Sequence, residues 1–323
     1  MVVCKAGAVS TVLVTGGAGF IGSHLVDAFV AAGDRVVVVD NLSSGSKANL
    51  ADAIAGGATL HEIDVTDAAS LLALAEQERP EVVIHLAAQI DVRVSVADPA
   101  WDAQINVIGT INTLQAALAA GSKRLVLAST GGAIYGDVET IPTPESTPAL
   151  PLAPYGTSKL CAETFLALYS RTSGLSTVAL RFANVYGPRQ DSLGEAGVVA
   201  IFAGAALADK PLTIFGDGRQ TRDYIYVGDV VAALVAAANN TVTGAINIGT
   251  GRETSVLDLA LAVDAAVGRP TTTPQHHPAR PGEVARSCLD PTLAAKLLGW
   301  AAEVALNDGI TRTVGAMAAA EKQ

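Results

Sequence analysis

A glycine-rich turn near the start of the chain constrains its fold more than any other stretch. Residues Thr15 to Gly22 read TGGAGFIG and lie between an apolar run and a helix-like pattern at 20–32. Gly16 allows a tight exit from a strand, Gly19 lets the backbone approach a pyrophosphate, and Gly22 lets the helix lie near the sheet. The N-terminus of that helix offers free N–H groups and a positive dipole end to phosphates. The stretch therefore predicts the first strand, turn and helix of a nucleotide-binding fold.

An acidic residue ends the next apolar run. The run at 35–39 is followed by Asp40, which lies 18 residues beyond Gly22. This is close to the offset of roughly 20 residues expected for a ribose-binding carboxylate. A carboxylate there binds the ribose 2′- and 3′-hydroxyls and repels a 2′-phosphate, so the pattern predicts NAD rather than NADP. An incidental acid after a surface turn is the weaker interpretation, because strand, turn, helix and acid follow in order.

The rest of the chain divides into a regular and an irregular half. Apolar strands at 59–63, 82–86, 123–129 and 177–182 alternate with helical patterns at 68–78, 99–120 and 154–173. This alternation predicts an α/β fold, a doubly wound parallel sheet with helices on both faces. The irregular half predicts a smaller, mixed α/β lobe for the substrate. We expect residues 1–183 with about 228–250 to form the NAD-binding domain, and 184–227 with 251–323 to form the lobe.

The net charge and the cysteine content indicate which kinds of binding partner and which cellular compartment to expect. The net charge of −10 and a pI near 4.9 argue against nucleic acid and anionic membrane surfaces. Three widely spaced cysteines argue against a disulfide framework and for a reducing compartment. No metal cluster, signal peptide or membrane span is evident in the sequence. We expect a cytoplasmic protein without a metal.

A tyrosine and a lysine one helical turn apart are the candidate reactive pair. Tyr155 and Lys159 follow Pro154, which suits the first turn of a helix. An ammonium group near a phenol lowers the phenol pKa, which would make Tyr155 a general base toward a hydroxyl. Such pairs also arise by chance on helix surfaces. The catalytic interpretation is favoured because the preceding strand ends in Ser129 and Thr130, whose hydroxyls could position a substrate oxygen.

The carboxyl ends of parallel strands meet at one edge of the sheet, where ligands bind. We therefore expect Asp40, Asp64, residues 87–89, Ser129–Thr130 and Asn184 to line one crevice. In it, Asp64 would meet the adenine end of the cofactor, and the stretch Leu86 to Gln89 would pack along it.

These motifs together resemble the extended short-chain dehydrogenase/reductase family. The resemblance continues through RFANVYGPR at 181–189, FGDG at 215–218, NIGTG at 247–251 and RPGE at 280–283, and so covers essentially the whole chain. The stretches DNLSSG at 40–45 and GVVAIF at 197–202 are similar to those of bacterial and archaeal members that act on UDP-hexoses.

The resemblance implies an enzyme, an isomerase that reversibly inverts C4 of a UDP-sugar by transient hydride transfer to tightly bound NAD. Tyr155 would take the proton from the 4-hydroxyl, and Lys159 would hold the nicotinamide ribose. Thr130 or Ser129 would bind the 4-oxygen. Many members place this alcohol four residues before the tyrosine of a Tyr-Gly motif, which is Gly131 when counted from Tyr135. A shift by one residue favours Thr130.

The resemblance also implies two sets of binding residues. The cofactor set comprises Gly16, Gly19, Phe20, Ile21, Gly22, Asp40, Asn41, Ser44, Gly45, Asp64, Val65, Leu86, Ala87, Ala88, Gln89, Asn106, Tyr155 and Lys159. The substrate set comprises Asn184, Val198, Thr213, Phe215, Arg222, Arg280, Glu283 and Ser287.

Within the substrate set, Asn184, Arg222 and Arg280 would bind the diphosphate, which suits arginine. Phe215 and the backbone near Thr213 would contact uracil, and Glu283 the uridine ribose. Arg222 could instead form a structural ion pair with Asp223 or Asp229. Several family members carry a tyrosine where this chain has Ser287, so the small residue predicts room for an N-acetyl group on the sugar.

Several alternatives remain open. A 4,6-dehydratase needs an acidic pair after the alcohol, but Gly131, Gly132 and Ala133 stand there. A UDP-glucuronate epimerase or decarboxylase would need a further cation for the sugar carboxylate. A non-catalytic NAD-binding regulator would not need Tyr155 and Lys159. We expect His24 and His85 to be structural and His276–His277 to be a loop feature.

The family usually dimerises through the two long helices read here at 99–120 and 154–173. Ile105, Ile108, Leu114 and Leu118 give the first of them apolar residues on more than one face, which permits a homodimer.

Overall fold

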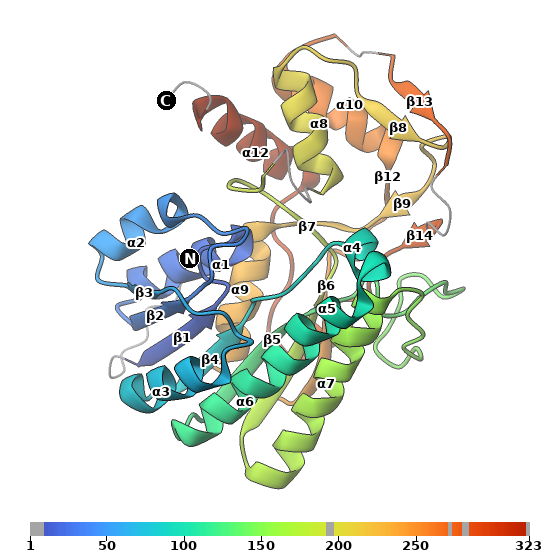
Figure 1. Ribbon diagram of the computed structural model, residues 1–323. Coiled ribbons are helices and arrows are strands. Elements are labelled where there is room, and N and C mark those ends of the chain that lie inside the picture. The colour runs from blue at the N-terminus through green and yellow to red at the C-terminus, as the bar shows by residue number, and fades with distance from the viewer. Residues whose placement is uncertain (1–9, 192–196, 271–272, 280–283, 321–323) are drawn as a thin grey trace.

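A seven-stranded sheet forms the larger half of the protein (Figure 1). The computed structural model describes residues 10–191, 197–270, 273–279 and 284–320. The strand order is β11-β6-β5-β4-β1-β2-β3, and every pairing within the sheet is parallel. The strands are β1 (Thr11–Thr15), β2 (Arg35–Val39), β3 (Thr59–His61), β4 (Val82–His85), β5 (Arg124–Thr130), β6 (Ser176–Phe182) and β11 (Gly244–Ile248). The strand order reverses at β1 and β4, because β2 and β3 lie on one side of β1 while β4, β5 and β6 lie on the other. Such a switch point is where this architecture binds ligands.

Helices cover both faces of this sheet. On one face lie α1 (Phe20–Ala31) and α9 (Val227–Ala238), and on the other lie α3 (Ala68–Glu78), α6 (Gly109–Ala119) and α7 (Pro154–Ser173). Side chains alternate along β1, so Val12 and Val14 pack toward α1 while Leu13 packs toward α3 and α6. The doubly wound α/β fold predicted from the alternating pattern is confirmed.

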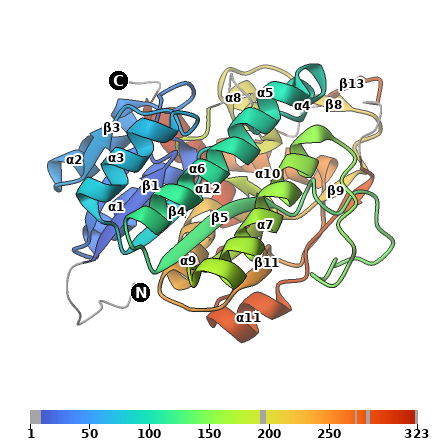
Figure 2. The same ribbon diagram turned by 60° about the horizontal axis from the view of Figure 1, so that its bottom comes forward.

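The helix predicted over 99–120 is not a single α-helix. It consists of α5 (Pro99–Ala103), a π-helical segment η2 (Gln104–Ile108) and α6. The helix α4 (Val92–Ala97), which we did not predict, precedes it. Figure 2 shows α5 and α6 running on as one rod beside α7. A π segment changes the rotation between the residues before and after it, and such segments are frequent at functional sites.

A second hydrophobic core supports the smaller lobe. Helices α8 (Val198–Leu207), α10 (Val256–Val267) and α12 (Leu306–Ala320) pack around Phe202, Leu259 and Ile310, which are fully or almost fully buried. The lobe also contains short strands. β7 (Asn184–Tyr186) pairs with β10 (Tyr224–Tyr226), β8 (Thr213–Phe215) with β13 (Gln275–His277), and β9 (Thr221–Arg222) with β12 (Thr254–Ser255) and β14 (Arg286–Ser287).

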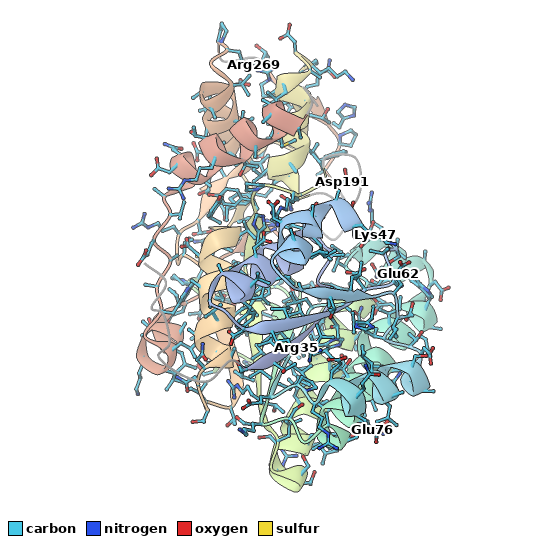
Figure 3. The ribbon with its side chains drawn as sticks, turned by 90° about the vertical axis from the view of Figure 1, so that its left-hand side faces the viewer. Arg35, Lys47, Glu62, Glu76, Asp191 and Arg269 are labelled. Carbon is cyan, nitrogen blue, oxygen red and sulfur yellow. The ribbon has the colours of Figure 1, made fainter. Side chains whose placement is uncertain are left out.

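Three further helical segments lie outside these layers: η1 (Lys47–Leu50), α2 (Ala51–Ala55) and α11 (Thr292–Leu298). Figure 3 shows Lys47 next to Glu62, and Arg269 at the far end of the lobe. The Lys47–Glu62 ion pair measures 2.5 Å, but both side chains are more than half exposed, so it stabilises the fold little. No helix in the described ranges is long and apolar enough to cross a membrane.

Candidate functional site

The glycine-rich turn brings the end of β1 close to the start of α1. Gly16 has a φ of +69°, and its N–H donates to the carbonyl of Val39 over 2.8 Å. A Cβ atom at Gly22 would lie 2.1 Å from the carbonyl oxygen of Gly16, so only glycine allows this approach. Gly19 occupies the N-cap and supplies no side-chain acceptor to the first turn of α1. The amide groups of that turn are therefore positioned to bind an anion.

Asp40 lies beside this turn, at the end of β2. Its side chain is buried, and its two oxygens accept the N–H groups of Ala18 at 2.9 Å and Leu42 at 2.8 Å. Gly45 approaches so closely that a Cβ atom there would lie 2.9 Å from Asp40 Oδ1. Each carboxylate oxygen can accept more than one hydrogen bond. The arrangement thus fixes Asp40 and leaves it able to accept from a ribose hydroxyl.

The next strand end supplies a second carboxylate. Asp64 Oδ2 accepts the side-chain amide of Asn41 at 2.7 Å, and Oδ1 accepts the N–H and hydroxyl of Thr66. Burial alone would raise the pKa of Asp64, but the hydrogen bonds outweigh it and lower the pKa. Val65 beside it is buried, and Asn112 donates to the Val65 carbonyl. Ser44 is exposed nearby in sequence and forms no part of this network among the described contacts.

The stretch after β4 lies opposite the turn. The N–H groups of Leu86 and Ala87 donate to the carbonyl and hydroxyl of Thr15, at 3.0 and 3.3 Å. His85 is buried between the hydroxyls of Thr15 and Thr110, at 2.7 and 3.0 Å. Burial, and then the charge of Lys159, lower the pKa of His85 to about 3, so its ring is neutral. This environment agrees with the structural role expected for His85.

Tyr155 and Thr130 meet at the centre of the site. Tyr155 lies in the first turn of α7, and its backbone N–H donates to Ser95 Oγ at 3.1 Å. The hydroxyl of Thr130 lies close enough to the Tyr155 hydroxyl to interact with it. Ser129 donates instead to Glu163 Oε1 at 2.6 Å, two turns further along α7. Of the two candidate alcohols, the structure places Thr130 beside the tyrosine.

Lys159 lies one turn further along α7 and is 3% exposed. Its ammonium donates to the Ala128 carbonyl at 3.0 Å. Burial lowers the pKa of Lys159 to about 8, against the opposing effect of Asp102 and Glu163.

The expected lowering of the Tyr155 pKa is wrong for the chain alone. Burial raises the pKa of Tyr155 to about 12, the interaction with the Thr130 hydroxyl opposes this rise, and the negative charge of Asp102 adds to it. The unfavourable desolvation of a phenolate outweighs any benefit from Lys159 in this environment.

The described substrate residues lie in the smaller lobe and at its junction with the sheet. Asn184 is exposed at the start of β7, and a Cβ atom on Gly132 would lie 3.7 Å from its Oδ1. Ser287 pairs with Arg222 in the parallel register of β14 and β9. Thr213 and Phe215 belong to β8, and Val198 begins α8. Arg280 and Glu283 lie outside the described residues.

Comparison with known proteins identifies the family. The sequence matches the NAD dependent epimerase/dehydratase family over residues 12–249. The chain belongs to this family. It is 47% identical to a UDP-glucose 4-epimerase of Mycolicibacterium smegmatis, over 94% of this chain and 96% of the relative.

Two solved structures are similar to this epimerase/dehydratase family member. A UDP-glucose 4-epimerase from Thermotoga maritima, solved with UDP-glucose, has a TM-score of 0.93 at 44% identity and covers 96% of this chain and 99% of its own. A UDP-glucose 4-epimerase from Thermus thermophilus, solved with NAD, has a TM-score of 0.89 at 42% identity and the same coverage.

The carboxylates considered as structural partners of Arg222 in this family member bind other groups. Asp223 accepts hydrogen bonds from Thr250, Gly251 and Leu289, and Asp229 accepts the N–H of Val304. In the described ranges no group of three or more His, Cys, Asp or Glu side chains could hold a metal ion.

Three parts of the site were not predicted from the sequence. Ser95 holds the backbone of Tyr155 from the unpredicted helix α4. Glu163 forms a buried ion pair with Arg181 at 2.7 Å. Asp102 lies on α5, which packs against α7, and its spacing of four residues from Asn106 was a signal that could have indicated a shared helix face.

Proposed function

We propose that this protein interconverts UDP-galactose and UDP-glucose by inverting C4 of the hexose, with NAD as its bound cofactor. The observation that carries the proposal is the hydroxyl contact between Tyr155 and Thr130, with Lys159 one helical turn away. Thr130 is the last residue of β5, and Lys159 donates to the Ala128 carbonyl, so the group lies at the carboxyl end of this strand, where the fold binds ligands. The similarity to UDP-glucose 4-epimerases over nearly the whole chain supports the same function.

The residues present fit a dinucleotide. The turn from Gly16 to Gly22, whose close contact a Cβ atom would block, would hold the pyrophosphate, and Asp40 would hold the adenosine ribose. Asn41 and Asp64 would bound the adenine end, and the stretch 86–89 would lie along the cofactor. When bound, NAD supplies the reversible hydride acceptor that inversion at C4 requires.

Residues of this chain would transfer the proton and orient the substrate. Tyr155 takes the proton of the sugar 4-hydroxyl, and Thr130 holds the 4-oxygen against it. Lys159 provides the positive charge that stabilises the phenolate. Burial raises the pKa of Tyr155 to about 12 in the chain alone, so the positive charge of bound NAD⁺ would favour the ionised form that the base needs.

The binding of the two ligands would divide between the two parts of the chain. We propose that 1–183 with about 228–250 bind NAD, and that 184–227 with 251–323 bind the UDP-sugar. Arg222 and Asn184 would hold the diphosphate, and Phe215 would contact uracil. The separate hydrophobic core of the lobe supports this division.

The 4,6-dehydratase alternative is disfavoured by packing as well as by sequence. A Cβ atom at Gly131, directly after Thr130, would lie 2.4 Å from Leu289 Cδ1. An acidic residue at this place would require the buried Leu289 side chain to move.

Sugar specificity would depend on Ser287. Its small side chain lies in β14 next to Arg222, and it supports acceptance of UDP-N-acetylhexosamines as well as hexoses. We expect Ser287→Tyr to abolish epimerisation of the N-acetyl sugar and to spare the plain hexose. Parallel assays with both UDP-sugars test this, and equal loss of both activities, or of neither, would contradict it.

The proposed function has a direct assay. The purified protein is incubated with UDP-galactose, without added nicotinamide, and UDP-glucose is followed by NMR. We expect an equilibrium mixture from the wild type and a rate at least about 100-fold lower from Tyr155→Phe. If no UDP-glucose forms even after NAD⁺ is added, the proposal is wrong.

We also propose that the protein works as a homodimer in the cytoplasm. Trp101 on α5, Ile108 on η2 and Leu168 on α7 are large apolar side chains that are 39–47% exposed. These helices lie side by side on one face (Figure 2), which suits a bundle formed with a second copy. Two residues expected in this interface have another role, because Leu114 is fully buried and Leu118 packs against the core of the sheet.

A further inference from the structure

A buried polar cluster lies on segments that pack against α7, the helix that carries the reactive pair. Asp102 on α5 is fully buried, and its Oδ1 accepts the side-chain amides of Gln89 at 2.8 Å and Asn106 at 2.9 Å. Asn106 also donates to the carbonyl of Gln89 at 2.9 Å, which closes the network. Among the described atoms, Asp102 Oδ2 and Asn106 Oδ1 have no hydrogen-bond partner. Leaving buried oxygens unpaired destabilises the folded state, so their presence calls for a functional explanation.

Asp102 and Asn106 both lie on segments that contact α7. Asp102 precedes η2 and Asn106 lies within it, and both α5 and η2 pack against α7. The charge of Asp102 acts on Tyr155 and on Lys159, and it raises the pKa of both groups. The unpaired carboxylate oxygen thus has an electrostatic role toward two groups on the neighbouring helix.

We infer that Asp102 is a positioning residue of the reaction, whose buried carboxylate sets the charge state of the Tyr155–Lys159 pair. This inference rests on the proposed function. Gln89 and Asn106 orient the carboxylate, which stabilises the ammonium of Lys159 and opposes ionisation of Tyr155 until the cationic cofactor is bound. The phenolate would then form only in the loaded enzyme, where a base is needed.

The other charged groups around the pair act differently. On α7, Glu163 also favours the charged form of Lys159, but Glu163 forms an ion pair with Arg181. On β4, His85 is neutral. Before α4, Asp91 pairs with the exposed Arg93 at 2.5 Å. Of Asp91, Asp102 and Glu163, it is Asp102 that acts on both Tyr155 and Lys159.

The test replaces the charge and keeps the shape. Asp102→Asn retains an acceptor for Gln89 and Asn106 but removes the negative charge. We expect the pKa of Tyr155 and that of Lys159 to fall by about one pH unit each, the size typical of a nearby charge. Both limbs of the pH profile of kcat should therefore move to lower pH together, with activity at pH 9 falling more than activity at pH 7.

A second measurement does not depend on activity. The holoenzyme is prepared with 3-fluorotyrosine, and the ¹⁹F resonance of residue 155 is assigned by its absence in Tyr155→Phe. Its titration midpoint should be about one pH unit lower in Asp102→Asn than in the otherwise unchanged protein. This measurement does not require epimerisation of UDP-galactose. It therefore tests the role of Asp102 separately from the proposed function.

The control is Asp98→Asn, which removes an exposed charge from the N-cap of the same helix. It should leave the pH profile and the ¹⁹F titration unchanged. Thermal unfolding by circular dichroism shows whether each variant is folded. An Asp102→Asn protein that is folded and loses activity equally at every pH, with an unchanged ¹⁹F midpoint, would overturn the inference.

Discussion

Among single residues, buried Lys159 destabilises the folded protein but provides the positive charge that the proposed reaction needs. Its pKa is lowered from an ordinary 10.5 to about 8, which corresponds to about 3 kcal/mol of free energy. The folded-state pKa lies below the unfolded one, so this destabilisation is fully present below pH 8 and disappears as the pH rises to 10.5. Lys159→Met changes the free energy of unfolding relative to the wild type. We expect this change to be about 3 kcal/mol more favourable at pH 7 than at pH 10.5.

Denaturant unfolding at the two pH values measures this difference. Lys123→Met is the matched control, because Lys123 lies on the surface in an ion pair with Glu81. Its effect on stability should hardly change with pH. A pH-independent effect of Lys159→Met would show that the lysine is not desolvated in the folded protein.

The two alcohols at the end of β5 give a second prediction at this scale. Thr130→Val should lower kcat about 100-fold, because it removes the hydroxyl that contacts Tyr155. Ser129→Ala should keep most of the activity and lower the free energy of unfolding by about 1–3 kcal/mol, since Glu163 loses a buried hydrogen bond. Steady-state kinetics and thermal melts distinguish the two variants. The reverse pattern would assign binding of the 4-oxygen to Ser129.

At the scale of elements, the contact between β1 and α1 decides cofactor binding. Gly22→Ala would place a methyl group 2.1 Å from the Gly16 carbonyl oxygen and push α1 away from the turn. We expect the purified variant to carry no NAD, measured as nucleotide released on denaturation. Gly315→Ala in α12 meets open space and should be neutral or slightly stabilising. A Gly22→Ala protein that retains full cofactor would contradict this account of the turn.

Periodicity predicted the regular elements well and the irregular ones poorly. The helix expected over 154–173 was found with the same bounds, because Pro154 starts it and Gly174 ends it in the left-handed region. The helix over 99–120 was predicted in the right place, but the π segment at Gln104–Ile108 has no signature in the apolar pattern. Asn106, which donates to Asp102, lies in that segment. The pairing of β14 with β9, which brings Ser287 to Arg222, is likewise set by tertiary contacts.

At the scale of the whole molecule, the exposed apolar face of α5, η2 and α7 predicts association. Leu168→Glu should weaken the dimer at least about 10-fold, because a charge would have to be buried in an apolar interface. Sedimentation velocity over a range of concentrations measures this. Leu261→Glu, on α10 in the smaller lobe, replaces a leucine that is exposed to a similar extent and should leave association unchanged. Equal effects of both variants, or a monomeric wild type, would contradict the proposed interface.

The fate of the hydrogen on C4 distinguishes inversion by hydride transfer from other chemistry at this carbon. The protein is incubated with UDP-galactose carrying deuterium at C4, and the product is followed by NMR in ordinary water. Inversion by removal and return of the same hydrogen predicts UDP-glucose that keeps the deuterium at C4. Deuterium lost to water, or a dehydrated product in place of UDP-glucose, would contradict the proposed chemistry.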